Sequence, residues 1–484
     1  MERELANVLQ TTGVSSARFE QGLEQLQTAG RGRFRRLWGY YANPMRVTQD
    51  QGGASDRPYR QAQEWGVPSR ITGYRAGLDP LCDGTLSTSA RKEVVIENDI
   101  AWRIDTQVDY LFGNPPMIHS LAPDPARRLA IETLLAAILD RNGGAQLLQQ
   151  IALIGAVYGF ADVAVTLDTS GDFGSAADSD TGNVDTARLV QIQVVEPARA
   201  VPLLDEQDVT RIVAYAQTYD VAADKVTGLF AGLLGIGRQT SRVVELWTPH
   251  GWWRWKDQEL VATGGNTLGR VPVVHIQNTA MPFAYGGNSD VEPLIPLQDE
   301  LNTRLSDRAH RIAMQSFRMY LGKNLEGFKA NPPAPGRIWE TTNPNAQIIE
   351  LGGEASSASE QAHIADVREA IDKISGVPPV AAGAIRNRVG NLTSAAALRI
   401  TLMSLLARTE RKRALYGEGL CHICELALAW LDHAGLFITL PEERGVELHW
   451  HSPLPENDAE KLAEAKQKLD LGVGKEVVLK ELGY

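Results

Sequence analysis

Residues 290–322 read DVEPLIPLQDELNTRLSDRAHRIAMQSFRMYLG, and this stretch has the pattern of one long amphipathic helix. Two possible ion pairs, Glu300–Arg304 and Asp307–Arg311, place the acid four residues before the base, which is the favourable order on a helix. Apolar residues recur along it at steps of three and four: Leu294, Leu297, Leu301, Leu305, Ala309 and Ile312. We therefore predict a helix over 290–322 that buries one face.

A small insert follows this helix. The segments RIWE (337–340) and AQIIEL (346–351) have the composition of strands, and the sequence Asn343-Pro344-Asn345 predicts a turn between them. Trp339 lies on the first of these strands, next to Ile338 and Glu340. Exposed aromatic residues on short strands often anchor partner proteins, so these three residues are candidates for docking.

Two more helices are predicted after the insert. The first begins with a capping box, Ser357 and Glu360, and ends at Gly376 before two prolines. A loop, VAAGAIRNRVGN, covers residues 380–391. The next helix is predicted from about Thr393 to His433, which at 1.5 Å per residue gives roughly 60 Å.

The sequence before residue 290 divides into three parts. The first ninety residues are predicted to be irregular; their arginines (31, 33, 35, 36 and 46) interleave with aromatic residues, and we favour a partner-docking arm or solvated face over nucleic-acid contact. Helices are predicted over 98–113, 126–139 and 145–158. Six short β-branched or aromatic runs between residues 189 and 278 predict a β-rich region.

Composition narrows the class of protein. The chain has 484 residues, a formal net charge of -11 and 43% hydrophobic residues, which excludes a uniformly basic nucleic-acid-binding coat. Three cysteines cannot build a disulfide framework, and Cys421 and Cys424 (CHIC) are expected to be buried thiols rather than a metal or redox pair. His449 and His451 are likewise expected on a half-exposed strand edge rather than in a metal site. No nucleophile-elbow, zinc-protease or P-loop spacing occurs.

The order of these elements resembles the portal proteins of tailed bacteriophages, in the branch typical of long-tailed siphophages. NDIAWRIDTQVDYLFGNPP (98–116) is similar to the family's early helix and turn, and GGNSDVEPLIPLQDELNTRLSD (286–307) to its first stem helix. ISGVPP (374–379) and GNLTSAAALRITLMSLLARTERKRALYGEGL (390–420) are similar to the segment that holds its second stem helix, tunnel loop and spine helix. The terminal DLGVGKEVVLKELG also has the look of the family.

The resemblance implies an α+β, portal-like fold with these regions: an N-terminal arm and irregular segment (1–97), a β-rich wing (98–289), stem helix 1 (290–322), a small α/β clip (323–356), stem helix 2 (357–376), a tunnel loop (377–392), a spine helix with a returning wing strand (393–456), and a short helical crown (457–484). The segment after the last strand is short, so a tall crown barrel is not expected.

The resemblance also implies a function. Portal proteins form a ring, usually of twelve subunits, at one capsid vertex, and double-stranded DNA enters and leaves through it. The implied partners are other copies of the chain, the DNA, the terminase large subunit, a head-completion or adaptor protein, and the major capsid and scaffolding proteins, with no membrane and no cofactor. The expected location is the virion, with assembly in the host cytoplasm, and no catalytic residues are expected.

Within this framework the loop supplies the candidate DNA-contacting residues. Arg386 and Arg388 would set a narrow positive band against the phosphates in an otherwise acidic ring. The other candidates are Val380, Gly383, Ile385, Asn387, Val389 and Gly390. An alternative role for the two arginines is pairing with carboxylates of a neighbouring subunit. Two other functions stay open: a cytoplasmic enzyme of unknown class, and another ring-forming interaction protein.

Overall fold

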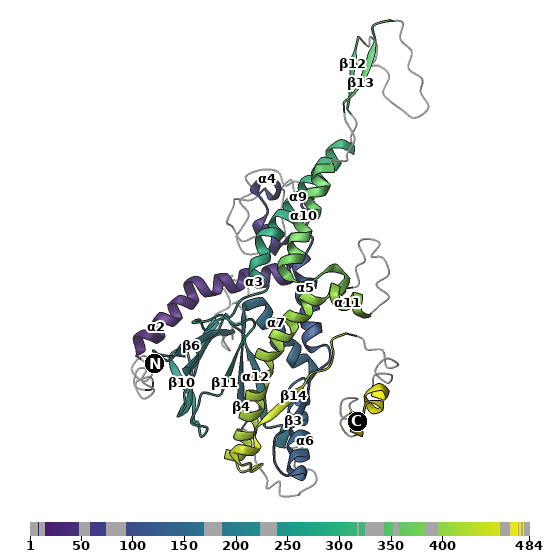
Figure 1. The fold of residues 1–484 in the computed structure, drawn as a ribbon. Coiled ribbons are helices and arrows are strands. Elements are labelled where there is room, and N and C mark those ends of the chain that lie inside the picture. Colours follow the sequence, from purple (N-terminus) through teal and green to yellow (C-terminus); the bar gives the residue numbers. More distant parts are fainter. Residues whose placement is uncertain are drawn as a thin grey trace. The chain divides into compact units, whose positions relative to one another are not determined.

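The computed structural model describes residues 8, 15–47, 59–73, 93–168, 186–222, 240–316, 319–324, 343–351, 358–382, 395–454, 465–472, 474, 475 and 478. These residues mix helices and antiparallel strands, which confirms the predicted α+β class (Figure 1). The chain divides into two compact units: unit 1 comprises residues 1–37, 104–290 and 380–484, and unit 2 comprises residues 38–103 and 291–379.

Unit 1 contains two larger antiparallel sheets. The five-stranded sheet has the order β10-β9-β8-β7-β6, and the three-stranded sheet has the order β11-β4-β5. All six predicted β runs are confirmed as strands. The bounds are β4 (Phe160–Leu167), β5 (Val190–Val195), β6 (Ala200–Leu204), β7 (Ile212–Ala222), β8 (Thr240–Trp247), β9 (Gly251–Lys256), β10 (Glu259–Gly265) and β11 (Val273–Gln277).

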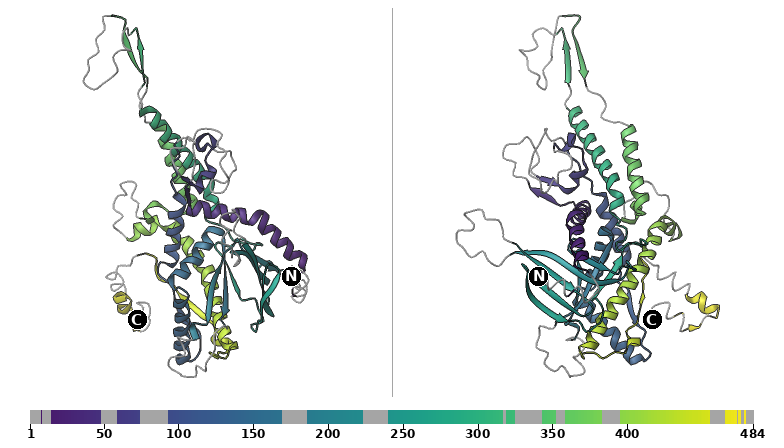
Figure 2. Two further views of the ribbon diagram at one scale, coloured as in Figure 1. Left: turned by 180° about the vertical axis from the view of Figure 1, so that it is seen from behind. Right: turned by 90° about the vertical axis from the view of Figure 1, so that its left-hand side faces the viewer.

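Helices cover the three-stranded sheet. The α12 helix (Met403–His433) packs on β4, β5 and β11, and shares one apolar core with α6 (Pro125–Arg141) and α7 (Ala145–Tyr158) (Figures 1 and 2). The helix α5 (Asp99–Phe112) ends before Gly113 as predicted. A small sheet pairs β3 (Met117–Ser120) with β14 (Val446–His449), so the predicted returning strand is confirmed over four residues.

The apolar run of residues 151–167 is divided between a helix and a strand. The α7 helix ends at Gly159, whose φ of 96° is the left-handed conformation that favours glycine at a helix terminus, and β4 begins at the next residue. A Cβ atom at Gly159 would lie 2.3 Å from the carbonyl oxygen of Gly287, so this position has no room for a side chain. No described helix is long and apolar enough to cross a membrane.

The prediction of an irregular N-terminus is wrong for residues 16–42. They form α2 (Ser16–Gln25), a π-helical turn at Leu26–Gly30, and α3 (Arg31–Ala42). The buried residues Phe19, Leu26, Phe34 and Leu37 are spaced by seven, eight and three positions. These steps keep the four residues near one face of a helix, but the charged residues between them conceal the pattern.

Unit 2 contains a pair of helices with a hairpin between them in sequence. A 3-10 turn, η3 (Glu292–Leu294), leads into α9 (Ile295–Ser316), and α10 (Ala358–Ser375) follows the hairpin of β12 (Met319–Lys323) and β13 (Gln347–Leu351) (Figure 2). The first helix therefore ends at Ser316 and not at Gly322, because residues 319–323 pair with 347–351 instead. Unit 2 also contains β1 (Met45–Val47), β2 (Tyr59–Gln61), η2 (Ala62–Gly66) and α4 (Ser69–Thr72). The 3-10 turn η5 (Pro379–Ala382) begins at the last residue of unit 2, and η6 (Pro441–Glu443) belongs to unit 1.

The single helix predicted from Thr393 to His433 is also wrong in part. It is divided into α11 (Ala395–Thr401) and α12 by Leu402, whose φ of −93° and ψ of 4° are outside the helical range. Leu402 is buried, whereas its neighbours Ile400 and Met403 are 72% and 67% exposed. The β-branched pair Ile400-Thr401 lowers the helix propensity at this point. Of the predicted crown, residues 465–470 are helical.

Candidate functional site

Most residues of the two predicted sites lie outside the described part of the chain. Val380 is half-buried in η5, and residues 383–390 of the predicted tunnel loop are not described. Ile338, Trp339 and Glu340 of the predicted docking strand are not described either, nor is Ser357 of the capping box. The roles given to these residues therefore stay predictions. The predicted second insert strand is confirmed as β13.

The α9 helix buries a row of polar side chains beside its apolar face. Gln298, Asn302 and Ser306 recur every four residues, and all three are fully buried. Their side-chain oxygens accept hydrogen bonds from the backbone N–H groups of residues 99, 97 and 95, at 2.9 to 3.1 Å. Two residues of extended chain advance about 6.7 Å and four helical residues about 6.0 Å. Every fourth side chain of the helix therefore stays opposite every second N–H group of the extended segment. The helix thus holds an extended segment as a neighbouring strand would.

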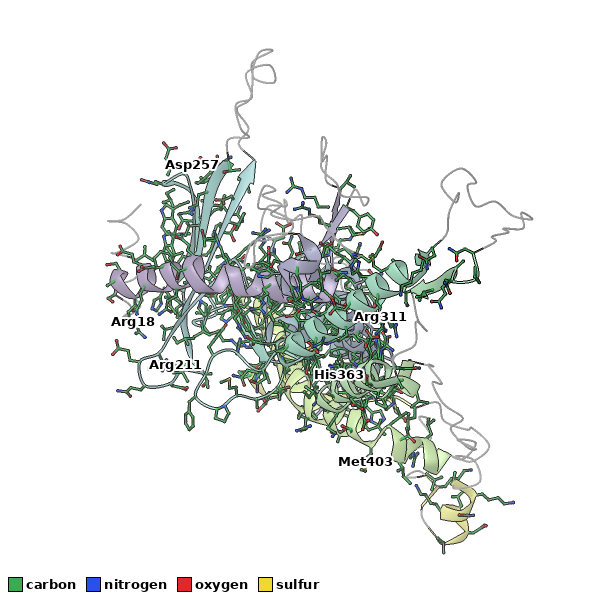
Figure 3. All side chains as sticks on the ribbon, turned by 90° about the horizontal axis from the view of Figure 1, so that it is seen from above. Arg18, Arg211, Asp257, Arg311, His363 and Met403 are labelled. Atoms are coloured by element: carbon green, nitrogen blue, oxygen red, sulfur yellow. The ribbon has the colours of Figure 1, made fainter. Side chains whose placement is uncertain are left out.

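Ion pairs join α10 to the rest of unit 2. Glu360 pairs with Arg311 of α9, and His363 Nε2 lies 3.0 Å from Glu300 Oε1; Figure 3 labels Arg311 and His363. Further along α10, Arg368 pairs with Glu97 and Asp372 with Arg103. Arg103 is completely buried, and its guanidinium also stacks 4.1 Å from the ring of Trp102. The two helices of unit 2 are therefore fixed by charges as well as by apolar contacts.

A second buried charge pair lies in unit 1 and involves Asp290, two residues before η3 begins. Lys412 Nζ of α12 lies 2.6 Å from Asp290 Oδ2 and donates to Gln107 Oε1 at 2.9 Å. Asn278 donates to the same Asp290 oxygen at 2.7 Å, and Tyr416 donates to Asn278 Oδ1 at 3.0 Å. This network joins α5, α12 and Asn278, the residue that follows β11, to Asp290.

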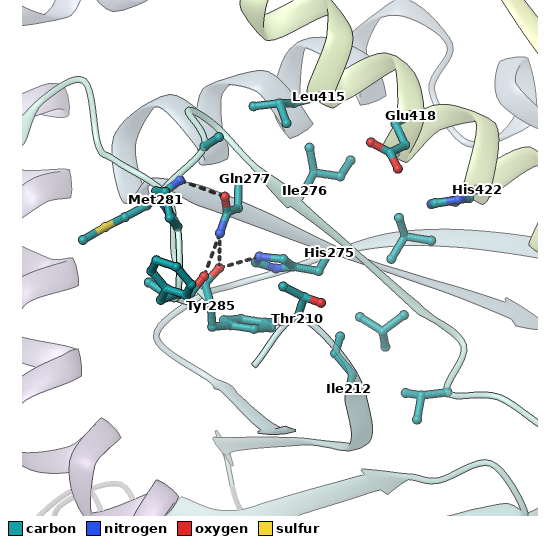
Figure 4. A pocket seen from close by; sticks show the side chains of 18 of the residues that line it. Thr210, Ile212, His275, Ile276, Gln277, Met281, Tyr285, Leu415, Glu418 and His422 are labelled. Carbon is teal, nitrogen blue, oxygen red and sulfur yellow. Dashed lines mark hydrogen bonds between the residues drawn. The ribbon is translucent and has the colours of Figure 1, made fainter. Parts of the chain in front are cut away.

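Asp162, on β4, is the centre of a third buried cluster. Its carboxylate accepts hydrogen bonds from the Tyr215 hydroxyl at 2.7 Å and the Tyr285 hydroxyl at 2.8 Å, and lies 2.7 Å from His275 Nδ1. His275 Nε2 lies 2.6 Å from the carbonyl oxygen of Tyr285 (Figure 4). The imidazole therefore bridges the Asp162 carboxylate and the backbone of the loop that contains Tyr285. The cluster fixes the loop 279–286 to the sheet.

A groove of about 670 Å³ opens beside this cluster. One wall is formed by α12, with Leu415, Glu418 and His422; the opposite wall includes Thr210 and Ile212, and β11 lies between the walls (Figure 4). The groove contains no group of side chains with a catalytic spacing.

We expect unit 1 to unfold at alkaline pH because of this burial. Burial raises the pKa of Tyr215 and of Tyr285 well above the ordinary 10.0, and the Asp162 carboxylate raises both further. Above pH 10 the unfolded chain loses these protons while the folded chain keeps them, so stability falls as pH rises. The slope should be up to ~1.4 kcal/mol per pH unit for each tyrosine. Tyr215→Phe should reduce the slope of denaturation free energy against pH; an unchanged slope would contradict this explanation.

The structure also places the cysteine and histidine pairs. Cys424 is buried, which raises the pKa of its thiol to about 12, and Cys421 is half-buried with its Sγ donating to the Val446 carbonyl. The expectation of buried thiols is thus confirmed for Cys424 only. His449 ends the exposed edge of β14, as expected, and His451 follows it. Within the described ranges, no three His, Cys, Asp or Glu side chains are grouped to hold a metal ion.

Sequence analysis missed the three buried polar clusters. The signal for Asp162 was a single carboxylate inside the apolar run 151–167, and the signal for Lys412 was a lysine between core positions of α12. Their hydrogen-bond partners lie 53 to 305 residues away in sequence, so nothing local identifies them.

Comparisons with known proteins identify the family. The family model described as "Phage portal protein, SPP1 Gp6-like" matches residues 98–483. No curated protein sequence matches the chain. Among solved structures, a chain of "Neck of empty GTA particle computed with C6 symmetry" is similar, with 14% identity, a TM-score of 0.43, and coverage of 77% of this chain and 89% of that chain. Because the family match spans far more than half of its residues, this chain belongs to the SPP1 Gp6-like family of phage portal proteins.

Proposed function

We propose that twelve copies of this chain form a ring at one vertex of a phage capsid, and that double-stranded DNA passes through its channel. The observation that carries the proposal is the order α9, β12–β13, α10, Pro378-Pro379 and α12 within the residues matched by the portal family. A helix pair with a terminal hairpin suits a stem that ends in a docking clip. The role is structural, and packaging energy would come from a separate motor.

In this proposal, each region has a task. The wing (98–289) contacts capsid and scaffolding proteins, and stem helices α9 and α10 surround the channel. The clip, which begins at β12 and ends near residue 356, binds the terminase during packaging and a head-completion protein afterwards. The loop 377–392 narrows the channel, the spine helix and returning strand (393–456) support it, and the crown (457–484) faces the capsid interior.

Native mass spectrometry of the purified chain tests the ring. The proposal predicts a discrete species of about twelve times the 52.9 kDa of one chain. A neighbouring ring number would revise the stoichiometry, whereas a stable monomer at micromolar concentration would contradict the proposal.

Trp339→Ala should separate docking from assembly. If Trp339 anchors a partner on the clip, its loss should weaken binding of terminase or adaptor about tenfold or more, as for an interface hot spot. Ring assembly should be unchanged by native mass spectrometry. Loss of soluble rings would instead place Trp339 in a structural core.

The double variant Arg386→Ala/Arg388→Ala tests the channel loop. Rings should form normally, but DNA packaging or retention should change, most strongly at low salt where phosphate attraction is least screened. A matched control removes two exposed arginines of unit 1, Arg211 and Arg242, and should have no effect. Rings that fail to assemble would favour intersubunit ion pairs, and normal packaging at every salt concentration would exclude a role in DNA contact.

A further inference from the structure

The edge strand β6 of the five-stranded sheet is closed to further strand pairing. Its outward positions include Pro202, which has no N–H group to donate. The guanidinium groups of Arg18 and Arg31 donate to the carbonyl oxygens of Leu204 at 3.2 Å and Ala198 at 3.4 Å. The N-terminal helix therefore blocks this edge.

The edge strand β5 of the three-stranded sheet is closed in a different way. The side chain of Asn142, at the end of α6, accepts from the Ile192 N–H at 2.8 Å and donates to the Val190 carbonyl at 3.0 Å. These are two of the outward-facing backbone groups of β5, because the ladder bonds of its other residues point to β4. One side chain thus occupies the hydrogen-bonding positions of a further strand.

The opposite edge of the same sheet, β11, is open. The Asn278 N–H donates to the Gly159 carbonyl, and the Pro272 carbonyl accepts from the Val165 N–H, so residues 272 and 278 direct these groups toward β4. Because successive residues of an antiparallel strand direct their backbone groups to opposite sides, Val273 and His275 direct theirs away from β4. No described residue forms a hydrogen bond with the backbone of either. Val273 is 7% exposed and the His275 side chain is 13% exposed, so this edge is unpaired within the described residues but lies below the outer surface. Unpaired strand edges are normally protected in proteins that stay monomeric.

The groove beside the Asp162 cluster follows this open edge. Its walls carry apolar side chains, among them Ile212 and Leu415, so an added strand would bury side chains on both faces. Phe283 lines the groove, is 96% exposed and has a φ of 61°, a conformation that is unfavourable for a phenylalanine. An exposed aromatic residue in a strained loop indicates a binding role.

The fourth edge of these two sheets is β10, and five of its seven residues are exposed. It pairs only with β9, and a bulge between Leu260 and Ala262 interrupts this ladder. Leu260 is 42% exposed and Val261 is 60% exposed. Among the described residues, the two larger sheets therefore have two open edges that differ in form: β10, with apolar side chains at 260–262, and the edge of β11 along the groove.

We propose that β10 of one copy enters the groove of the next copy and pairs with β11, extending the three-stranded sheet across the subunit boundary. A ring of identical chains needs two different surfaces that bind head to tail, and these two edges supply them. This inference rests on the proposed ring and specifies one of its interfaces.

Photo-crosslinking in assembled rings tests the contact directly. Val261 is replaced by a photoreactive phenylalanine derivative in the full chain, and isotopically heavy and light chains are mixed before assembly. Crosslinks between heavy and light chains should map to the groove, within residues 271–285 or 415–426. The same replacement at Leu129, which is 67% exposed on α6, is the control and should give no crosslinks to these residues.

A second variant is needed in case the photoreactive side chain at position 261 itself prevents ring assembly. Val261→Lys should reduce the yield of rings at least tenfold, and Leu129→Lys should not. Rings of Val261→Lys at the wild-type yield, or heavy–light crosslinks that fall outside the groove, would overturn the inference while leaving the proposed ring intact. Absence of rings from the wild-type chain would instead contradict the proposed function.

Discussion

Replacing Lys412 by methionine is expected to lower the free energy of unfolding by about 3–5 kcal/mol, the usual effect of removing one member of a buried ion pair. Methionine retains the length of the side chain but leaves the Asp290 carboxylate, which is 8% exposed, without its closest cation. Gln107 also loses its partner. Urea denaturation of the unassembled chain, followed by circular dichroism, measures the loss.

A double-mutant cycle separates the charge pair from general packing. Lys412→Met combined with Asp290→Asn should recover a large part of the stability, because no uncompensated charge is then buried. Arg211→Met removes an exposed partner of Asp205 and should change stability by less than about 1 kcal/mol. If Lys412→Met costs no more than Arg211→Met, the network does not stabilise unit 1.

Asp162→Ala is expected to have the next largest effect, also about 3–5 kcal/mol. It leaves the Tyr215 and Tyr285 hydroxyls and His275 Nδ1 without their acceptor in a buried site. The loop 279–286 would lose its attachment through Tyr285. Faster proteolysis within that loop should therefore accompany the loss of stability in the denaturation curve.

Two variants show whether the carboxylate itself matters. Asp162→Asn keeps the size and one acceptor oxygen, so its effect should be intermediate. Asp220→Ala removes the carboxylate of an exposed pair with Arg242, at 3.9 Å, and should change stability little. Equal effects of Asp162→Ala and Asp220→Ala would mean that the cluster does not stabilise unit 1.

The elements that the sequence predicted well are those with a strong local pattern. The β runs between residues 189 and 278 alternate with turn residues, and the helices ending at Gly113 and Gly376 carry clear stop signals. The order of helix, insert, helix and long helix could also be read from periodicity, and that order carried the resemblance to portal proteins.

The errors arise where distant pairing overrides local pattern. Residues 319–323 continue a helical pattern but form β12, because residues 347–351 offer a ladder of backbone hydrogen bonds. The break at Leu402 depends on burial of that side chain, which the sequence does not reveal. The open edge of β11 and the Asn142 cap on β5 depend on the order of strands in the sheet, and no single segment encodes that order.

Electron cryomicroscopy of the purified full-length chain is the most direct test of the central claim. The account predicts closed rings of twelve copies with a central channel wide enough for a DNA double helix, with α9 and α10 around it. Particles that average to a compact monomer or a dimer, with no channel, would contradict it.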